Sequence, residues 1–185
     1  MKVPRSIAPD VLPDILAPGL GLVVCGSAAG TRSAELGAYY AGPGNQFWGM
    51  LHRVGLTPTL LRPAEFRKVI RYGIGLTDIV KTSFGADSSL KPADFDRDGL
   101  FRRIETFQPR VFAFNGKRSA SAFFGKSVAY GYQFRQDIGT TKIYVAPSTS
   151  GAARGFWDES LWRLVAQEVQ GSTAERIVAS TVSGR

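Results

Sequence analysis

The segment CGSAAGTRSAELGAYYAGPGNQFW, residues 25–48, contains the pattern from which the fold class follows. It continues a short apolar run, residues 19–26 (GLGLVVCG), whose β-branched side chains and bounding glycines are typical of a buried strand. The small residues after this strand let the backbone approach a ligand or another segment closely. Apolar residues return at helical spacing in residues 46–54, which predicts a helix there. A strand, a glycine-rich loop and a helix in this order indicate an α/β fold with a ligand crevice at the carboxyl end of the strand.

The same alternation continues along the chain. We predict three further strands, at residues 74–80, 110–114 and 142–146, and helices at 63–71, 92–107, 117–124 and 157–170. Strands separated by helices indicate a mostly parallel four-stranded sheet with helices on both faces, so the fold class is α/β. The predicted organisation is a proline-rich lead at 1–18, a single domain at 19–170 and a flexible tail at 171–185.

Composition limits the function classes. A formal net charge of +8 on 185 residues favours a polyanionic partner, and nucleic acid is the commonest one. The single cysteine, Cys25, excludes a disulfide within the chain. With only one histidine, His52, the chain also offers few residues to a metal ion, so we predict no metal site. Without a bilayer-spanning run or a signal-like N-terminus, we expect a cytoplasmic, nucleoid-associated monomer with no membrane partner.

Two predicted strands end in polar residues that could serve a ligand site. Asp78 stands in an otherwise apolar strand, where a carboxylate is costly unless it is paired or functional. The alternative is an aspartate that caps a turn. Asn115 ends the next predicted strand and Lys117 opens the helix after it, an arrangement that attracts anions. The alternative there is a turn with a solvated charge.

Aromatic and hydroxyl groups mark the other two strand ends. Tyr40, in the loop after the first strand, offers a flat face that can stack on a base, or it packs in the core. The loop after the last strand combines hydroxyls, small residues and an arginine, which suit a DNA backbone: Ser148, Thr149, Ser150, Gly151, Ala152 and Arg154. The alternative is a serine-rich turn that caps the last helix.

Taken together, these segments resemble the mismatch-specific uracil/thymine-DNA glycosylase family of the uracil-DNA glycosylase superfamily. That family has a strand ending in CGINPG, a loop close to GHHYAGPGNHFW, a strand like GITNIV, an FNGK turn and a loop like PSSSAR. Here the matching segments are CGSAAG (25–30), GAYYAGPGNQFW (37–48), GLTDIV (75–80), FNGK (114–117) and PSTS (147–150). They occur in the same order and extend the resemblance from about residue 21 to 162.

The resemblance implies a three-layer αβα sandwich and a base-flipping mechanism, in which the damaged nucleotide leaves the stack and enters a pocket. Tyr40 matches the family aromatic that stacks on the flipped base, and Asn45 matches a residue that holds the pocket in shape. The implied base pocket consists of Gly26, Ser27, Ala28, Tyr40, Asn45, Asp78 and Asn115. The implied DNA contacts are Lys117, Ser148, Thr149, Ser150, Gly151, Ala152 and Arg154.

The chain departs from the family at the residue that positions the attacking water. The family has an asparagine there, and this chain has Ala28, whose methyl group can neither orient nor activate water. Asp78 is the first candidate to replace it, because a carboxylate could orient water or accept the imide N–H of uracil. Asn115 is the second candidate for either role, and Ser27 the third.

Three functions follow as hypotheses. The first is a monofunctional DNA glycosylase that hydrolyses the N-glycosidic bond of uracil, or of other deaminated bases, in double-stranded and also single-stranded DNA, with water and no cofactor. The second is a damaged-DNA-binding protein of the same fold with weak or no catalysis, which Ala28 favours and Asp78 opposes. The third is an unrelated nucleotide-binding α/β protein, but CGSAAGTRS matches neither GxxxxGK[ST] nor GxGxxG.

Overall fold

A five-stranded sheet forms the centre of the structure, a computed structural model in which we describe residues 9–182, without the side chains of 154, 156 and 172–182. The strands are β1 (Leu22–Gly26), β2 (Ile74–Asp78), β3 (Val111–Asn115), β4 (Gly131–Tyr132) and β5 (Lys142–Ala146). Their order in the sheet is β2-β1-β3-β5-β4, and all neighbours pair in parallel except β4 with β5. The predicted four strands are all present, and the fifth, β4, is an antiparallel edge of two residues, too short for its pattern to be recognised in the sequence.

The helices follow the predicted alternation with local differences. They are α1 (Thr31–Leu36), α2 (Phe47–Arg53), α3 (Arg97–Phe107), α4 (Lys117–Phe124) and α5 (Glu159–Val182), with 3-10 segments η1 (Pro63–Tyr72), η2 (Asp87–Ser89), η3 (Pro92–Asp94) and η4 (Gly151–Phe156). The helix predicted from residue 92 is divided: η3 comes first, and α3 begins after Asp96, whose side chain accepts from the Gly99 amide. The short α1 lies in the predicted glycine-rich loop and ends at Gly37 in the left-handed conformation.

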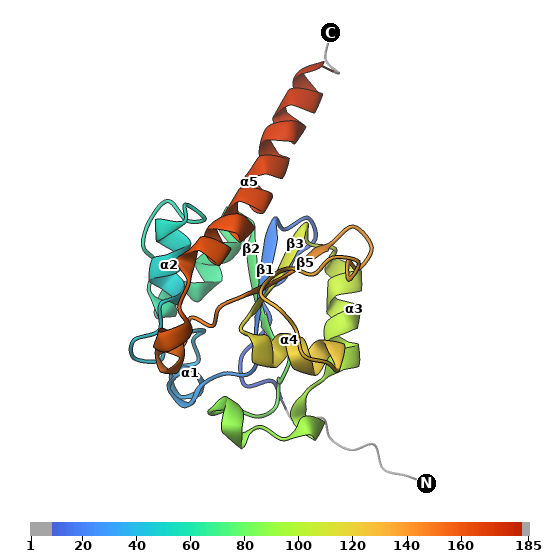
Figure 1. The fold of residues 1–185 in the computed structure, drawn as a ribbon. Coiled ribbons are helices and arrows are strands. Elements are labelled where there is room, and N and C mark those ends of the chain that lie inside the picture. The colour runs from blue at the N-terminus through green and yellow to red at the C-terminus, as the bar shows by residue number, and fades with distance from the viewer. Residues whose placement is uncertain (1–8, 183–185) are drawn as a thin grey trace.

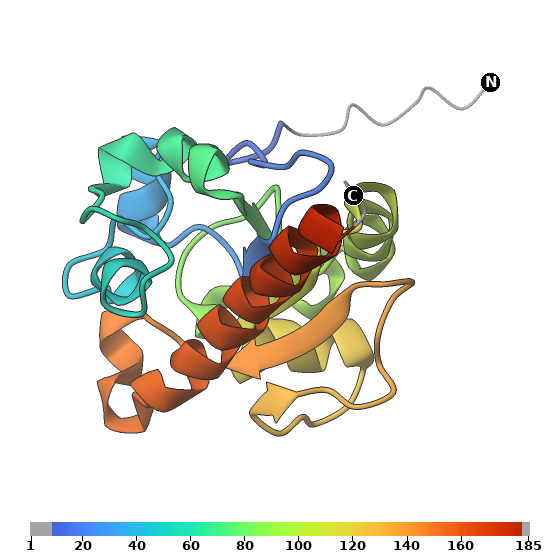
Figure 2. The ribbon, with the colours of Figure 1, turned by 90° about the horizontal axis from the view of Figure 1, so that it is seen from above.

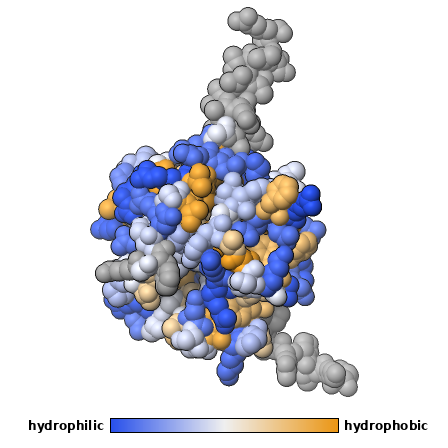
Figure 3. Space-filling model, viewed as in Figure 1, coloured by the Kyte–Doolittle hydropathy of each residue, from blue (hydrophilic) through white to orange (hydrophobic). Residues whose placement is uncertain are grey.

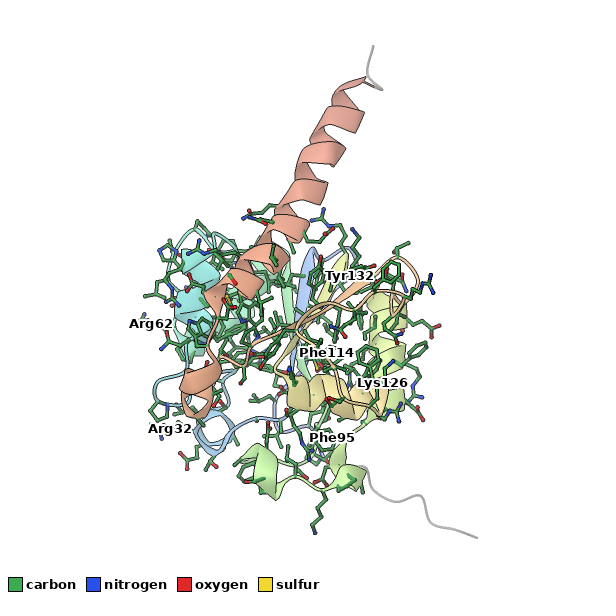
Figure 4. All side chains as sticks on the ribbon, in the orientation of Figure 1. Arg32, Arg62, Phe95, Phe114, Lys126 and Tyr132 are labelled. Carbon is green, nitrogen blue, oxygen red and sulfur yellow. The ribbon has the colours of Figure 1, made fainter. Side chains whose placement is uncertain are left out.

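The elements form three layers (Figures 1 and 2). On one face of the sheet, Leu22, Val24 and Leu76 pack with residues of α2, η1 and α5. On the other face, Val23 and Phe114 pack with residues of α3 and α4. Figure 4 shows Phe114 in the interior, whereas the charged side chains of Arg32, Arg62 and Lys126 lie at the periphery. The structure is therefore the predicted αβα sandwich.

The N-terminal segment lies along the outer edge of β2. Ile15 forms an antiparallel bridge with Leu76, and the amide of Val11 donates to the carbonyl of Lys81 at 2.7 Å. Leu12 and Ile15 are buried in the core. The described part of the predicted lead, residues 9–18, is thus packed onto the domain beside the strand that carries Asp78.

The last helix extends beyond its predicted end. Residues 171–185 were predicted to form a flexible tail because they are small and polar. The triplet Gly171, Ser172 and Thr173 also disfavours a helix. Instead α5 continues to Val182, and Figure 1 shows it rising away from the sheet. The alanine, glutamate and arginine at 174–176 are good helix formers and favour continuation after the weak triplet.

Candidate active site

The carboxyl ends of the parallel strands bring the predicted pocket residues to one edge of the sheet. Gly26 is paired with Asp78, and Asn115 with Ala146. Side chains alternate between faces along a strand. Since Val24, Leu76 and Ala113 face the layer of α2 and α5, the residues two positions later, Gly26, Asp78 and Asn115, face the same layer.

The carboxyl group of Asp78 is buried against the end of β1. Asp78 is 3% exposed, and its carboxylate accepts a hydrogen bond from the backbone N–H of Gly26. Burial raises the pKa of Asp78 to about 7, against the opposing effect of the Lys81 charge. A Cβ on Gly26 would collide with Oδ1 of Asp78, so the site requires a glycine at this position. The result is a carboxyl group that exchanges a proton near neutral pH.

Tyr40 stands beside this carboxyl group. Its backbone is in the left-handed region, with φ 54°, and its ring stacks on Phe47 with a centroid distance of 3.8 Å and an interplanar angle of 27°. The hydroxyl oxygen is buried and makes no hydrogen bond of good geometry among the described residues, although the Asn115 amide lies close enough to lower its pKa. It lies 3.5 Å from the position that a Cβ on Gly26 would occupy. Burial, and then the charge of Asp78, raise the pKa of Tyr40, so the hydroxyl stays protonated and can donate.

Asn115 is tied to the loop after β5. Its Nδ2 donates to Thr149 Oγ1 and its Oδ1 accepts from the Thr149 amide, both at 2.9 Å. The Thr149 carbonyl accepts from the Gln46 amide at 2.8 Å, and the Trp162 indole donates to the Pro147 carbonyl. Asn115 therefore holds the final loop against the loop before α2 through both the nitrogen and the oxygen of its side-chain amide.

The remaining pocket residues shape the two loops after β1. Asn45 Oδ1 accepts from the Phe47 amide at 3.0 Å and so fixes the start of α2. The carbonyl of Ser27 accepts from the Val80 amide at 2.8 Å, which joins the loops after β1 and β2. Ala28 packs against the core on the α3 and α4 face, away from Asp78. Of the three candidates for the water-positioning role, only Asp78 has an ionisable side chain, and this side chain is buried.

The predicted DNA contacts differ in accessibility. Ser150 and Ala152 are exposed and Ser148 is half-buried, but Thr149 is fully buried, and its hydroxyl serves the Asn115 hydrogen bond rather than the surface. A Cβ on Gly151 would meet the Pro43 carbonyl at 2.9 Å, so this glycine permits the loops to approach.

Two basic residues complete the predicted DNA contacts. Lys117 is exposed, and its ammonium lies 4.3 Å from the centroid of the Tyr130 ring. The side chain of Arg154 lies outside the described part of the structure.

A charged cluster that the sequence did not reveal lies next to the backbone of Asp78. Lys81 is 8% exposed, and its ammonium donates to Asp14 Oδ1 at 2.6 Å. Arg103 from α3 also approaches Asp14, with 3.7 Å between Nε and Oδ2. The available signal was a lysine only three residues after Asp78, but its partner lies in the proline-rich lead.

One surface hollow lies away from the carboxyl ends of the parallel strands. It has a volume of about 370 Å³, lies between α3, α4 and residues 135–138, and is lined by Phe101, Phe123, Arg97 and Arg135 among others. Its acidic and basic rim groups are equal in number, Arg97 and Arg135 against Asp98 and Asp137. The face shown in Figure 3 is mostly hydrophilic with scattered apolar side chains. Because the buried carboxyl group of Asp78 lies at the carboxyl ends of the strands, this edge is a stronger candidate for the catalytic site than the surface hollow.

Features of two other classes of site are absent from the described part of the chain. Among the side chains that the structure describes, no group of three His, Cys, Asp or Glu residues is placed to hold a metal ion. Within residues 9–182, no helix is both long and apolar enough to cross a membrane.

Fold and site together define a three-layer α/β protein with a buried carboxyl group and an aromatic ring at the carboxyl edge of its parallel strands. The chain belongs to the uracil DNA glycosylase superfamily, whose family model matches residues 13–166. A solved structure with a similar fold is the solution NMR structure of a candidate uracil DNA glycosylase from Methanosarcina acetivorans. It is 24% identical, covers 86% of this chain and 96% of its own, and superposes with a TM-score of 0.57.

Proposed function

We propose that this protein is a monofunctional DNA glycosylase of the mismatch-specific uracil/thymine branch. It hydrolyses the N-glycosidic bond of uracil, or of another deaminated base, and leaves an abasic site. The observation that carries the proposal is the buried carboxyl group of Asp78, with a pKa of about 7, at the strand edge where a flipped base would enter. The proposed reaction uses water as the nucleophile and no cofactor.

The proposed reaction uses Asp78 in place of the missing asparagine. As the C1′–N bond breaks, its electron pair leaves with the base and the sugar becomes cationic. Water adds to C1′, and the ionised Asp78 orients this water and accepts its proton. The same carboxylate stabilises the cationic sugar but opposes the anionic base. Backbone N–H groups of the loop after β1 are the donors that would offset this repulsion at the base carbonyls.

Tyr40 and the final loop supply binding in this proposal. The Tyr40 ring, supported from behind by Phe47, stacks on the flipped base. Its hydroxyl faces the same space over Gly26 as the Asp78 carboxylate, where it can donate to the base or to water. Ser148, Ser150 and the backbone of 150–152 contact the DNA phosphates.

A second function has one specific observation in its favour. Ala28 packs into the core on the opposite side of the sheet from Asp78, so the family's water-positioning side chain has no substitute at its own position. A protein that kept the pocket and lost the chemistry would bind uracil-containing DNA without cleaving it.

A single-turnover assay separates these functions. End-labelled duplexes with one uracil opposite guanine or adenine, the matching single strands, and hypoxanthine and xanthine substrates are incubated in EDTA and then cleaved at abasic sites with alkali. We expect cleavage by the wild type and a loss of about 100-fold or more in Asp78→Asn, with DNA binding retained. Asp98→Asn, which changes an exposed carboxylate in the first turn of α3, serves as the matched control.

The outcomes of this assay are distinct. Cleavage that is unchanged in Asp78→Asn would remove Asp78 from the mechanism. No cleavage of any substrate, combined with specific retention of uracil-containing DNA in a gel shift, would establish the lesion-binding function instead.

A further inference from the structure

We infer that Asp14, Lys81 and Arg103 form a positioning cluster that fixes Asp78 and controls its charge, which makes the N-terminal segment a working part of the active site. This inference rests on the proposed role of Asp78. It assigns a function to residues outside the pocket itself.

The cluster centres on the Asp14 carboxylate. Asp14 Oδ1 accepts from the Lys81 ammonium at 2.6 Å and from the Thr77 hydroxyl at 2.7 Å. Arg103 Nε lies 3.7 Å from Asp14 Oδ2. The ammonium of Lys81 also donates to the Leu12 carbonyl at 2.8 Å. One carboxylate thus joins three elements: the N-terminal segment, β2 with its following loop, and α3.

This arrangement surrounds the backbone of Asp78. Thr77 directly precedes Asp78, Lys81 follows it by three residues, and Arg103 Nη2 donates to the Asp78 carbonyl at 3.3 Å. Thr77 points to the opposite face of β2 from the Asp78 side chain, because side chains alternate along a strand. The cluster therefore lies on the opposite side of β2 from the Asp78 carboxyl group. From there its charges can act on Asp78 without contact with a substrate.

Burial makes these charges effective. Lys81 has a side chain that is 7% exposed and Arg103 one that is 18% exposed, so water screens them weakly. The cations of Lys81 and Arg103 lower the pKa of Asp78, whereas the anion of Asp14 raises it. Two further carboxylates approach the cations of the cluster: Asp10 lies 3.6 Å from Lys81 and Asp96 lies 3.8 Å from Arg103. The neutral titratable groups near the Asp78 carboxyl are the thiol of Cys25 and the hydroxyls of Tyr39 and Tyr40. Burial raises the pKa of all three, so they are neutral at physiological pH and add no charge beside Asp78.

A purely structural purpose would not require charges here. A buried ion pair is often no more stabilising than apolar side chains of similar volume, because both ions must be desolvated. The cluster is built from opposite charges with opposite effects on Asp78. That property gives a test that separates positioning from simple support of the fold.

The test is a direct titration of Asp78 in the full chain. The carboxyl carbon of Asp78 is followed by NMR in ¹³C-aspartate-labelled protein and assigned from its absence in Asp78→Asn. We expect Asp14→Asn to lower the titration midpoint, and Lys81→Met to raise it, each by about 0.5–1 pH unit. Lys142→Met and Glu168→Gln, which break an exposed ion pair of 2.7 Å remote from the strand ends, should leave it unchanged.

Opposite shifts from the two partners of one ion pair support the inference, because loss of fold alone would move both variants in the same direction. Shifts of the same sign, or no shift in either variant, overturn it. If Lys81→Met does not fold, Arg103→Met provides the same test, since the guanidinium acts on Asp78 with the same sign as Lys81. Lys81→Arg should restore the wild-type midpoint.

The enzymatic readout is the acidic limb of the kcat/KM profile against pH, which should move with the NMR midpoint in each variant. The titration itself uses no substrate. A protein without glycosylase activity but with opposite NMR shifts would therefore disprove the proposed function and leave the charge control of Asp78 standing.

Discussion

The Asp78 carboxylate occupies the space where a side chain on Gly26 would stand. The two residues are partners in the parallel pairing of β1 and β2, and the Gly26 amide donates to the carboxylate. A Cβ at Gly26 would collide with Oδ1 of Asp78. The glycine after Cys25 is thus explained by a carboxylate that is distant in sequence.

Substitution of Gly26 should therefore displace Asp78. We expect Gly26→Ala to reduce single-turnover cleavage by about 100-fold, because small displacements of reacting groups have effects of this size. Gly30→Ala is the matched control, since no atom lies within 4 Å of a Cβ at Gly30 in the same loop. Equal activity of the two variants would show that the position of the carboxylate does not limit the reaction.

The raised pKa of Asp78 predicts a pH-dependent stability. Below the ordinary pKa of 3.8, both the folded and the unfolded states are protonated, and Asp78 has no effect. Between 3.8 and about 7 only the unfolded state ionises, so Asp78 destabilises the fold increasingly, and above about 7 the penalty is constant. Asp78→Asn should raise the free energy of unfolding at pH 8 by a few kcal/mol, on the order of 1.4 per pH unit between the two pKa values.

Urea unfolding of Asp78→Asn and wild type between pH 3.5 and 8.5 measures this difference. The stabilisation should vanish as the pH falls toward 4. A stabilisation that does not depend on pH would mean that Asp78 is not a buried carboxyl group with a raised pKa. Asp98→Asn controls for the loss of an exposed charge.

Local pattern was sufficient to predict most of the fold. The strand at 142–146 and the helix at 117–124 are confirmed with the predicted bounds, because each has a continuous periodic pattern and a clear boundary. β4 escaped prediction because two residues carry no periodicity. The 3-10 form of η1 was also not foreseen, since its apolar spacing resembles that of an α-helix.

The candidate site was predictable only where its residues follow strands. Because the strands were predicted to be parallel, residues at their carboxyl ends, such as Gly26, Asp78 and Asn115, were expected at one edge of the sheet. Hydrogen-bond partners were not predictable in this way. Lys81 and Asp14 are separated by 67 residues, and the pairing of Asn115 with Thr149 spans 34, so neither follows from a local pattern.

Tyr40 should have two separable functions. Tyr40→Phe removes a buried hydroxyl that makes no hydrogen bond of good geometry, so it should stabilise the free protein by about 1 kcal/mol while cleavage falls. Tyr40→Ala also removes the stacking face and should weaken the complex with an uncleavable uracil analogue by about 1–3 kcal/mol. Tyr39→Phe is the control, because the Tyr39 hydroxyl is likewise buried without a partner; it should stabilise the protein and leave cleavage unchanged. Full activity of Tyr40→Phe would limit this residue to stacking.

The Asn115–Thr149 pair should act on DNA affinity through the loop that it holds. Asn115→Ala leaves the Thr149 amide and hydroxyl unpaired in a buried place, so it should destabilise the protein by about 2–4 kcal/mol and weaken binding to damaged and undamaged duplexes alike. Thr149→Val removes only one of the two bonds and should show a smaller effect of the same kind. Because both variants break the same interaction, the double variant should destabilise the protein by less than the sum of the two single variants.

Gln108→Ala is the matched control, since the Gln108 side-chain amide holds Thr140 in an exposed loop before β5, at the opposite end of the sheet. Fluorescence anisotropy with both duplexes and the single-turnover rate at saturating enzyme separate the two effects. A loss of rate without a loss of affinity in Asn115→Ala would place Asn115 among the groups that touch the reacting atoms rather than among those that hold the loop.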